Sequence, residues 1–240
     1  MSSSTPTPGL GPTNQPPEQM TPIVGIGASA GSVEALQHFF EGLPSHPDMA
    51  FVVVTHLSPD HDSDLVSILQ RDTDLSVRTV AEGDSPKPNT VFVLPPRRRL
   101  RIADDQFHLE EQTDPDGPPS VIDTFFRSLA NDQGQAGIGV ILSGTDGTLG
   151  IRALKEHGAL VMAQAPHNAK YKGMPRSAHE TGLLDVIDKA DQLGAELPRY
   201  WSHTTISGAE WEGNSQEEEE EEEEEELLTK IFAQLYAETG

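Results

Sequence analysis

Short apolar runs alternate with amphipathic segments along most of the chain. The run 50–55 has the length and β-branched content of a buried strand, whereas 32–41 has the apolar spacing of a helix. Strands that alternate with helices are typical of a mostly parallel sheet covered on both faces. We therefore predict a doubly wound α/β fold. The predicted strands are 23–26, 50–55, 76–80, 138–142 and 159–164, and the predicted helices are 32–41, 63–71, 119–131, 148–157 and 175–181.

Three shorter segments depart from this strand-helix alternation. Apolar and polar residues alternate in 90–94, 99–103 and 106–110, with tight turns between the segments. Such a pattern is typical of strands that expose one face. It predicts a small antiparallel hairpin beside the parallel sheet.

The composition changes at both ends of this α/β pattern. Residues 1–20 are rich in Ser, Thr, Pro and Gly, which predicts a disordered leader before a domain of residues 21–198. Residues 199–226 predict an acidic linker, because they include ten consecutive glutamates that repel one another. Residues 227–240 have the apolar spacing of an amphipathic helix that is cut off by the chain end.

Charge and cysteine usage narrow the function classes. The 240 residues carry a formal charge of −23 and include no cysteine. The negative net charge disfavours binding to nucleic acid or to an anionic membrane through the overall electrostatic field of the protein. The absence of cysteine excludes disulfides, thiolate metal sites and a cysteine nucleophile. No apolar run approaches the ~20 residues that span a bilayer, and the N-terminus lacks the pattern of a signal peptide. We expect a soluble, cytoplasmic protein.

A Gly-x-Ser-x-Gly turn around Ser29 links the first predicted strand to the first predicted helix. This is the setting of a nucleophile elbow, in which the serine hydroxyl stands clear of the sheet and the N–H of Ala30 can face a developing negative charge. Two other interpretations remain open for the turn alone. It suits an ordinary tight connection, or a dinucleotide loop, although its glycine spacing does not match G-x-G-x-x-G.

His56 follows the second predicted strand and changes the balance between these interpretations. Carboxyl ends of parallel strands meet at one edge of a sheet, so His56 and Ser29 are expected to lie close together. A serine hydroxyl needs a neighbouring base, and imidazole is mostly neutral at cytoplasmic pH. A surface histidine would be the ordinary interpretation, but the pairing with the elbow favours a general base.

A third member of such a set would be a carboxylate that orients the imidazole. Asp146 lies in the turn after the predicted strand 138–142, where it could equally be an N-cap for the next helix. The chain order Ser, His, Asp differs from the Ser, Asp, His order of the α/β-hydrolases. Ser29, His56 and Asp146 are thus the candidate catalytic residues.

Two further clusters have weaker functional interpretations. A metal site could use the five acidic and histidine side chains near the second strand, but their order is more typical of a loop and a helix cap formed by Asp62 or Ser63. We predict no metal and no cofactor. The basic residues Arg97, Arg98, Arg99 and Arg101 suit a solvated hairpin turn, or a docking site for an acidic partner. The metal candidates are His56, Asp60, His61, Asp62 and Asp64.

Six sequence motifs resemble the catalytic domain of the chemotaxis receptor methylesterases, the CheB type of protein-glutamate methylesterase. They occur in order within residues 21–198. The motifs are VGIGASAG at 24–31, VTHLSP at 54–59, VLPP at 93–96, VILSG at 140–144, DGTLG at 146–150 and GMPRS at 173–177.

This resemblance implies a hydrolase that removes γ-methyl esters from glutamates on chemoreceptor helices, with deamidation of glutamine as a further activity. The family's nucleophile, base and aspartate fall on Ser29, His56 and Asp146, and its oxyanion-binding N–H falls near Thr145. The chain is most similar to versions fused to a receptor methyltransferase and sensory domains, because 227–240 resembles the first helix of such a methyltransferase. Expected partners are methylated chemoreceptor helices and a methyltransferase or sensory domain.

The turn that carries Asp146 is two residues shorter than the family's usual Gly-x-Gly-x-Asp-Gly. Two residues span ~7 Å of chain, and catalysis is sensitive to ~1 Å of misplacement. An alternative hypothesis is therefore a catalytically impaired binding or regulatory module of the same fold.

Overall fold

The computed structural model describes residues 21–29, 32–55, 62–112, 120–144 and 149–206. The leader, the glutamate run and the segment 227–240 lie outside the described residues. Within the described part, no helix is both long enough and apolar enough to cross a membrane.

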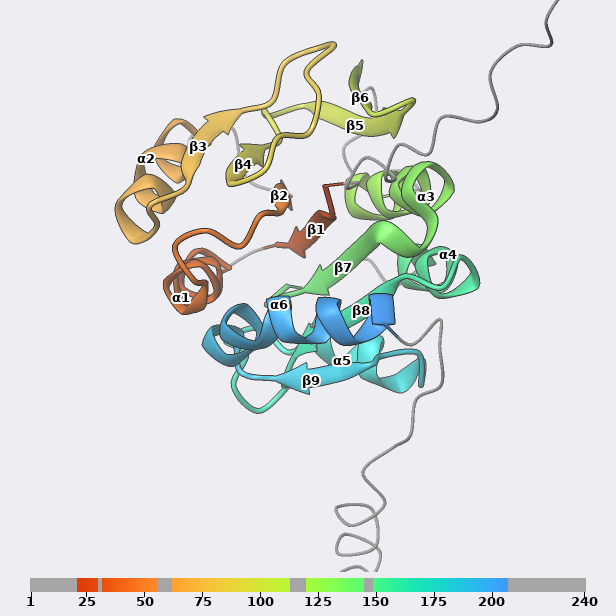
Figure 1. Ribbon diagram of the computed structural model, residues 1–240. Coiled ribbons are helices and arrows are strands. Elements are labelled where there is room, and N and C mark those ends of the chain that lie inside the picture. Colours follow the sequence, from red (N-terminus) through yellow and green to blue (C-terminus); the bar gives the residue numbers. More distant parts are fainter. Residues whose placement is uncertain (1–20, 30–31, 56–61, 113–119, 145–148, 207–240) are drawn as a thin grey trace, which may run out of the picture. The chain divides into compact units, whose positions relative to one another are not determined.

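Seven parallel strands form the central sheet, in the order β3-β4-β2-β1-β7-β8-β9 (Figure 1). Residues paired between the three middle strands include Ala28 with Thr55 and Gly27 with Ile141. The order places the first strand at the centre, with the second and seventh on its two sides. The strands are β1 (Ile23–Ala28), β2 (Ala50–Thr55), β3 (Ser76–Thr79), β4 (Thr90–Val93), β7 (Gly137–Ile141), β8 (Leu160–Gln164) and β9 (Val186–Asp188).

Helices cover both faces of this sheet, as its continuous apolar strands require. On one face lie α1 and α6, and on the other lie α3 and α4 (Figure 1). Alternate residues of β2 point to opposite faces: Phe51 meets the ring of Phe39, whereas Val52 belongs to the core around Phe125. The helices are α1 (Val33–Gly42), α2 (Asp62–Asp72), α3 (Val121–Gln133), α4 (Leu149–Glu156), α5 (Gly173–Glu180) and α6 (Ala190–Ile206), with a 3₁₀ turn at Gly134–Ala136.

The predicted fold class is confirmed, but the hairpin is smaller than expected. It consists of β5 (Arg98–Ala103) and β6 (Gln106–Glu111) only, and it packs on α3. The segment predicted at 90–94 as part of the hairpin is instead β4, which pairs in parallel with β2 and β3. All four of its residues are buried, so its apparent alternation did not mark an exposed face.

Two other expectations about local structure differ from the fold. The predicted cap by Asp62 or Ser63 was wrong, because α2 begins at Asp62 and includes both residues. The prediction missed β9 and α6, and α6 continues through Pro198. A proline removes one backbone donor from a helix without obliging it to end there. The compact unit that holds the sheet extends through Arg199.

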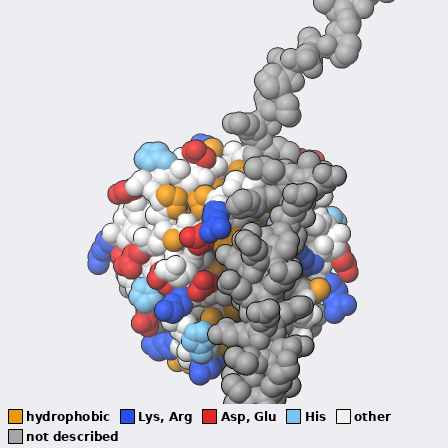
Figure 2. Space-filling model, turned by 60° about the horizontal axis from the view of Figure 1, so that its bottom comes forward, with side chains coloured by type: hydrophobic (Ala, Val, Ile, Leu, Met, Phe, Trp, Pro, Cys, Tyr) orange, Lys and Arg blue, Asp and Glu red, His pale blue; other side chains and the backbone are white. Residues whose placement is uncertain are grey.

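Charges of both signs are interspersed over the described surface in the view of Figure 2. That face therefore shows no large single-sign patch of the kind that attracts nucleic acid. The arginines of the hairpin also lie among acidic side chains. Arg101 pairs with Glu110 at 3.3 Å, and Arg98 lies opposite Glu111 in the strand register.

Candidate active site

Ser29 directly follows β1, at the carboxyl edge of the sheet and between two neighbouring strands. Thr55, the last residue of β2, pairs with Ala28, and Ile141, the last residue of β7, pairs with Gly27. Residues that follow the three strands therefore start from the same edge. Ligands and catalytic groups of open α/β sheets gather at such an edge.

The backbone of Ser29 is fixed from two directions. Its N–H donates to the carbonyl of Ser143 at 3.1 Å, and its own carbonyl accepts from the N–H of Ser32 at 3.0 Å. Ser32 is the N-cap residue of α1, so the second bond ties the serine to the start of that helix. Ser29 is only 5% exposed. Ser29 thus follows the strand as the sequence predicts, but it is more enclosed than the exposed serine expected at a nucleophile elbow.

Gly144 provides the space that Ser29 occupies. A Cβ added to Gly144 would lie 2.7 Å from the Cβ of Ser29 and 2.4 Å from the sulfur of Met174. Its backbone is also pinned, because its N–H donates to the carbonyl of Tyr171 at 3.2 Å and its carbonyl accepts from the N–H of Met174 at 2.7 Å. A side chain at position 144 would therefore compete with the serine for the same volume.

Buried polar groups hold the strand end that supports Ser29. Gln164, at the end of β8, accepts from the N–H of Ser143 at 3.0 Å, and its amide nitrogen donates to the Asn168 side chain at 3.1 Å. Ser143 is wholly buried, and its hydroxyl accepts from the N–H of Tyr171 at 3.0 Å. The carbonyl that receives the Ser29 N–H therefore belongs to a residue whose other polar groups are paired.

Ser29 is the only predicted catalytic residue among those that the structure describes. Ala30, His56, Thr145 and Asp146 lie outside the described residues, as do Asp60 and His61 of the alternative metal cluster, and the side chains of Asp62 and Asp64 are likewise not described. What the structure describes of the predicted site is therefore the nucleophile and the strands and helices around it.

Sequence reasoning missed the polar residues that support this edge. Ser143 and Gln164 follow or end neighbouring apolar strands, and that position was the available signal. Asp123 gave no such signal, because it lies within the apolar face of α3. Asp123 is 4% exposed, and its carboxylate accepts from the N–H of Gly150 at 2.7 Å.

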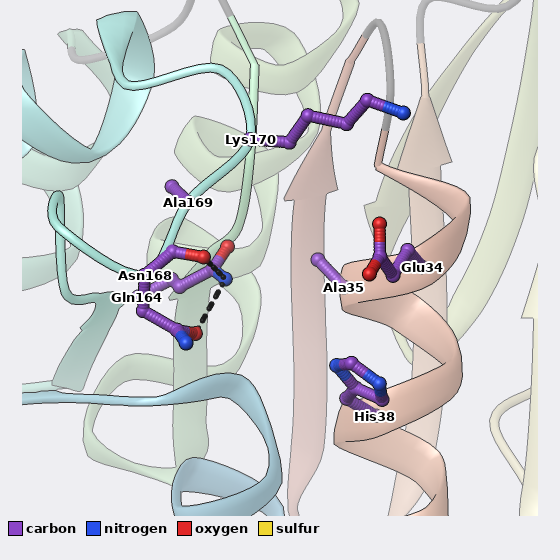
Figure 3. A pocket seen from close by; sticks show the side chains of 7 residues that line it. All are labelled: Glu34, Ala35, His38, Gln164, Asn168, Ala169 and Lys170. Atoms are coloured by element: carbon purple, nitrogen blue, oxygen red, sulfur yellow. Dashed lines mark hydrogen bonds between the residues drawn. The ribbon is translucent and has the colours of Figure 1, made fainter.

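A cavity of about 250 Å³ lies between α1 and the segment that follows β8 (Figure 3). Glu34 and His38 line it from α1, and Lys170 extends across it toward the start of that helix. Gln164 forms part of the opposite wall, so the cavity adjoins the hydrogen-bonded support of Ser29. Its charged lining suits polar groups rather than an apolar ligand.

Two carboxylates near the hairpin, Glu82 and Asp84, have lowered pKa values. The N–H of Leu109, followed by the ring of His108, holds the pKa of Glu82 below its ordinary value. Burial acts to raise the pKa of Asp84, but the Arg78 side chain and a backbone N–H outweigh it and leave that pKa lowered. These carboxylates belong to the junction of β3 with the hairpin and do not contact Ser29.

Comparison with known proteins shows which family the chain resembles. A model of the CheB methylesterase family matches residues 24–197. The protein-glutamate methylesterase/protein-glutamine glutaminase 1 of Myxococcus xanthus is 32% identical over 181 residues, which cover 73% of this chain and 52% of that protein. A putative protein of the same name from Leptospira interrogans is 31% identical over 177 residues, which cover 72% of this chain and 90% of that protein.

A solved structure resembles most of this chain. The crystal structure of the Thermotoga maritima CheB methylesterase catalytic domain has a TM-score of 0.68 and 28% identity, and the match covers 75% of this chain and 98% of that one. Several curated relatives are longer than this chain, which spans only about half of their length. The match covers 52% of the protein from Myxococcus xanthus and 41% of the protein from Moorella thermoacetica.

Proposed function

The chain belongs to the CheB methylesterase family, and on that premise we propose that it is a cytoplasmic serine esterase for glutamate γ-methyl esters on chemoreceptors. Hydrolysis releases methanol and leaves a glutamate carboxylate. The same chemistry on a glutamine side chain releases ammonia, so deamidation belongs to the proposal. Two relatives carry both activities in their names, protein-glutamate methylesterase and protein-glutamine glutaminase.

The proposed mechanism has two steps that share one base. Ser29 Oγ attacks the ester carbonyl while His56 takes its proton, and the N–H groups of Ala30 and Thr145 stabilise the oxyanion. His56 returns the proton to the leaving methoxide, which departs as methanol and leaves an acyl-serine. His56 then activates water, which releases the carboxylate and restores Ser29. Asp146 keeps the imidazole oriented and stabilises its cation.

The observation that carries this proposal is the position of Ser29 between two strand ends. In the sequence, His56 is the next residue after β2, and Asp146 is the fifth residue after β7. Both strands neighbour β1, so the three candidate residues originate from adjacent positions on one edge. The close fit of Gly144 and the paired backbone of Ser29 support a preorganised nucleophile.

The cavity between α1 and the segment after β8 supports a polypeptide substrate. Its volume of about 250 Å³ is below the ~300–1,000 Å³ of usual small-molecule sites and suits one or two side chains. Lys170 and Glu34 offer opposite charges to polar residues that flank the modified glutamate. Methylated receptor helices are thus the proposed partner, and a receptor methyltransferase or sensory domain is a further proposed partner.

The direct test is methanol release from a methylated chemoreceptor by the purified chain. Ser29→Ala is expected to lower turnover by roughly 10⁴-fold or more, because the members of a catalytic set act as a unit. Ser45→Ala is the matched control, since it makes the same chemical change at an exposed serine in the loop before β2. Release of methanol by Ser29→Ala at the wild-type rate would refute the mechanism.

No finding favours the alternative of an impaired binding module. The same assay separates it from the esterase, because an impaired module would bind methylated receptor without releasing methanol from it. In that case wild type and Ser29→Ala would bind equally and would both be inactive.

A further inference from the structure

Asp123 is a buried residue in the first turn of α3 whose carboxylate is hydrogen-bonded to a different helix. The N–H of Asp123 already receives its cap from the Ser120 hydroxyl at 3.1 Å. The Asp123 side chain turns instead to α4 and accepts from the N–H of Gly150 at 2.7 Å. Burying a carboxylate is costly unless it is hydrogen-bonded, so a side chain that is 4% exposed signals a specific requirement.

The bond from Asp123 fixes the beginning of α4. Gly150 is the second residue of that helix, and its N–H is one of the first four that have no partner within the helix. A carboxylate at this end also complements the helix dipole. The two helices approach closely here, because a Cβ at Gly150 would lie 2.6 Å from the Cβ of Phe126. The start of α4 is therefore held by both a charge and a tight contact.

The chain is anchored a second time six residues earlier. Gly144 lies against Ser29, donates to the carbonyl of Tyr171 and accepts from the N–H of Met174. Gly144 and Gly150 thus bracket the stretch of sequence that contains Asp146. One anchor belongs to the nucleophile side of the site and the other depends on Asp123.

We propose that Asp123 is a positioning residue for the esterase reaction, which holds the start of α4 so that Asp146 is presented to His56. This inference rests on the proposed function. Asp123 acts through the backbone of Gly150 and does not touch the substrate. Asp146 lies only four positions before Gly150 in the sequence, so a displacement of Gly150 is expected to reach it.

A purely structural role for Asp123 makes different predictions. If the carboxylate only stabilised the packing of α3 on α4, its removal would lower the folded fraction and leave the folded molecules fully reactive. If it positions Asp146, the folded molecules themselves react more slowly. They also lose the carboxylate that stabilises the cation of His56, so the pKa of His56 falls and the acid limb of the activity profile moves to lower pH.

The test compares the rate at which a fluorophosphonate labels Ser29, per folded molecule and as a function of pH. Asp123→Ala is expected to lower the rate by roughly 10- to 100-fold, since ~1 Å of misplacement costs up to that much, and to shift the acid limb downward. Asp123→Asn keeps an acceptor oxygen for Gly150 and is expected to recover most of the rate. Asp132→Ala, which removes a carboxylate from the far end of the same helix, is the matched control.

A double variant identifies the route through Asp146. Asp123→Ala is expected to cause no further loss in an Asp146→Ala background, because both changes remove the same interaction. Multiplying losses would overturn the inference, and so would a wild-type rate with an unshifted acid limb in Asp123→Ala.

Gly150→Ala provides a second way to displace the anchor if Asp123→Ala folds poorly. It leaves the carboxylate in place but pushes the start of α4 away from Phe126, and it is expected to give the same slow labelling and the same pH shift. A wild-type profile in Gly150→Ala would likewise overturn the inference. A wild-type chain that is not labelled at all would overturn the proposed function and the inference together, whereas a labelled wild type with unaffected variants would overturn the inference alone.

Discussion

Replacing Gly144 with alanine is expected to impair the nucleophile through a contact of less than van der Waals distance. The added Cβ would lie 2.4 Å from the Met174 sulfur and 2.7 Å from the Ser29 Cβ, whereas non-bonded carbon atoms prefer ~3.5–4.0 Å. The flexible Met174 side chain can adjust to such a contact. The Cβ of Ser29 cannot rotate away, because it is attached to a backbone that is hydrogen-bonded through both its N–H and its carbonyl. Ser29 must therefore shift by about 1 Å, because that is roughly the missing separation.

A shift of this size has a calculable effect on both activity and stability. Misplacement of a reacting group by ~1 Å can cost about 10²-fold in rate, and overpacking of a core typically costs ~1–3 kcal/mol. The assay is methanol release from methylated receptor, divided by the folded fraction, together with urea unfolding. We expect kcat to fall by roughly 100-fold while the variant stays folded.

Gly194→Ala is the matched control for this substitution. Its Cβ would lie 2.1 Å from the carbonyl oxygen of Phe39, in the contact between α6 and α1 and away from Ser29. This variant is expected to lose stability but to keep its turnover per folded molecule. Wild-type turnover per folded molecule in Gly144→Ala would refute the idea that Gly144 reserves space for the nucleophile.

Two further predictions concern stability. Gln164→Leu leaves the buried N–H of Ser143 without its acceptor and is expected to lower the free energy of unfolding by ~1–3 kcal/mol in urea titrations; an unchanged value would contradict a structural role for that bond. Glu82→Gln is expected to be less stable than wild type at neutral pH, and the difference is expected to shrink on acidification. A carboxylate with a lowered pKa stabilises the fold above its ordinary pKa and loses that effect as the pH falls through its folded-state pKa. A stability difference between Glu82→Gln and wild type that grew on acidification would contradict a stabilising carboxylate at position 82.

The parallel sheet could be predicted from the sequence because its strands are buried on both faces. Such strands are continuous apolar runs, and β1, β2, β7 and β8 all stand out in this way. The edge strand β9 lacks that signal. In β9 none of the three residues is buried, and Ile187 is 40% exposed, so no apolar pattern marked it.

The nucleophile could be predicted because its motif is local, whereas its supports could not. Gly-x-Ser-x-Gly lies within five consecutive residues at a strand-helix junction. The bonds that hold the surroundings join Ser143 to Gln164, 21 residues apart, and Gly150 to Asp123, 27 residues apart. Only the folded chain brings such pairs together, so an aspartate on an apolar helix face gave no hint of its partner.

The most direct test of the esterase mechanism is covalent trapping of Ser29 by a fluorophosphonate, followed by mass spectrometry of the adduct. The mechanism predicts one phosphonylated residue, Ser29, and labelling that is nearly abolished in His56→Ala, because the hydroxyl depends on that base. An adduct on another residue, or equally fast labelling of Ser29 without His56, would contradict it.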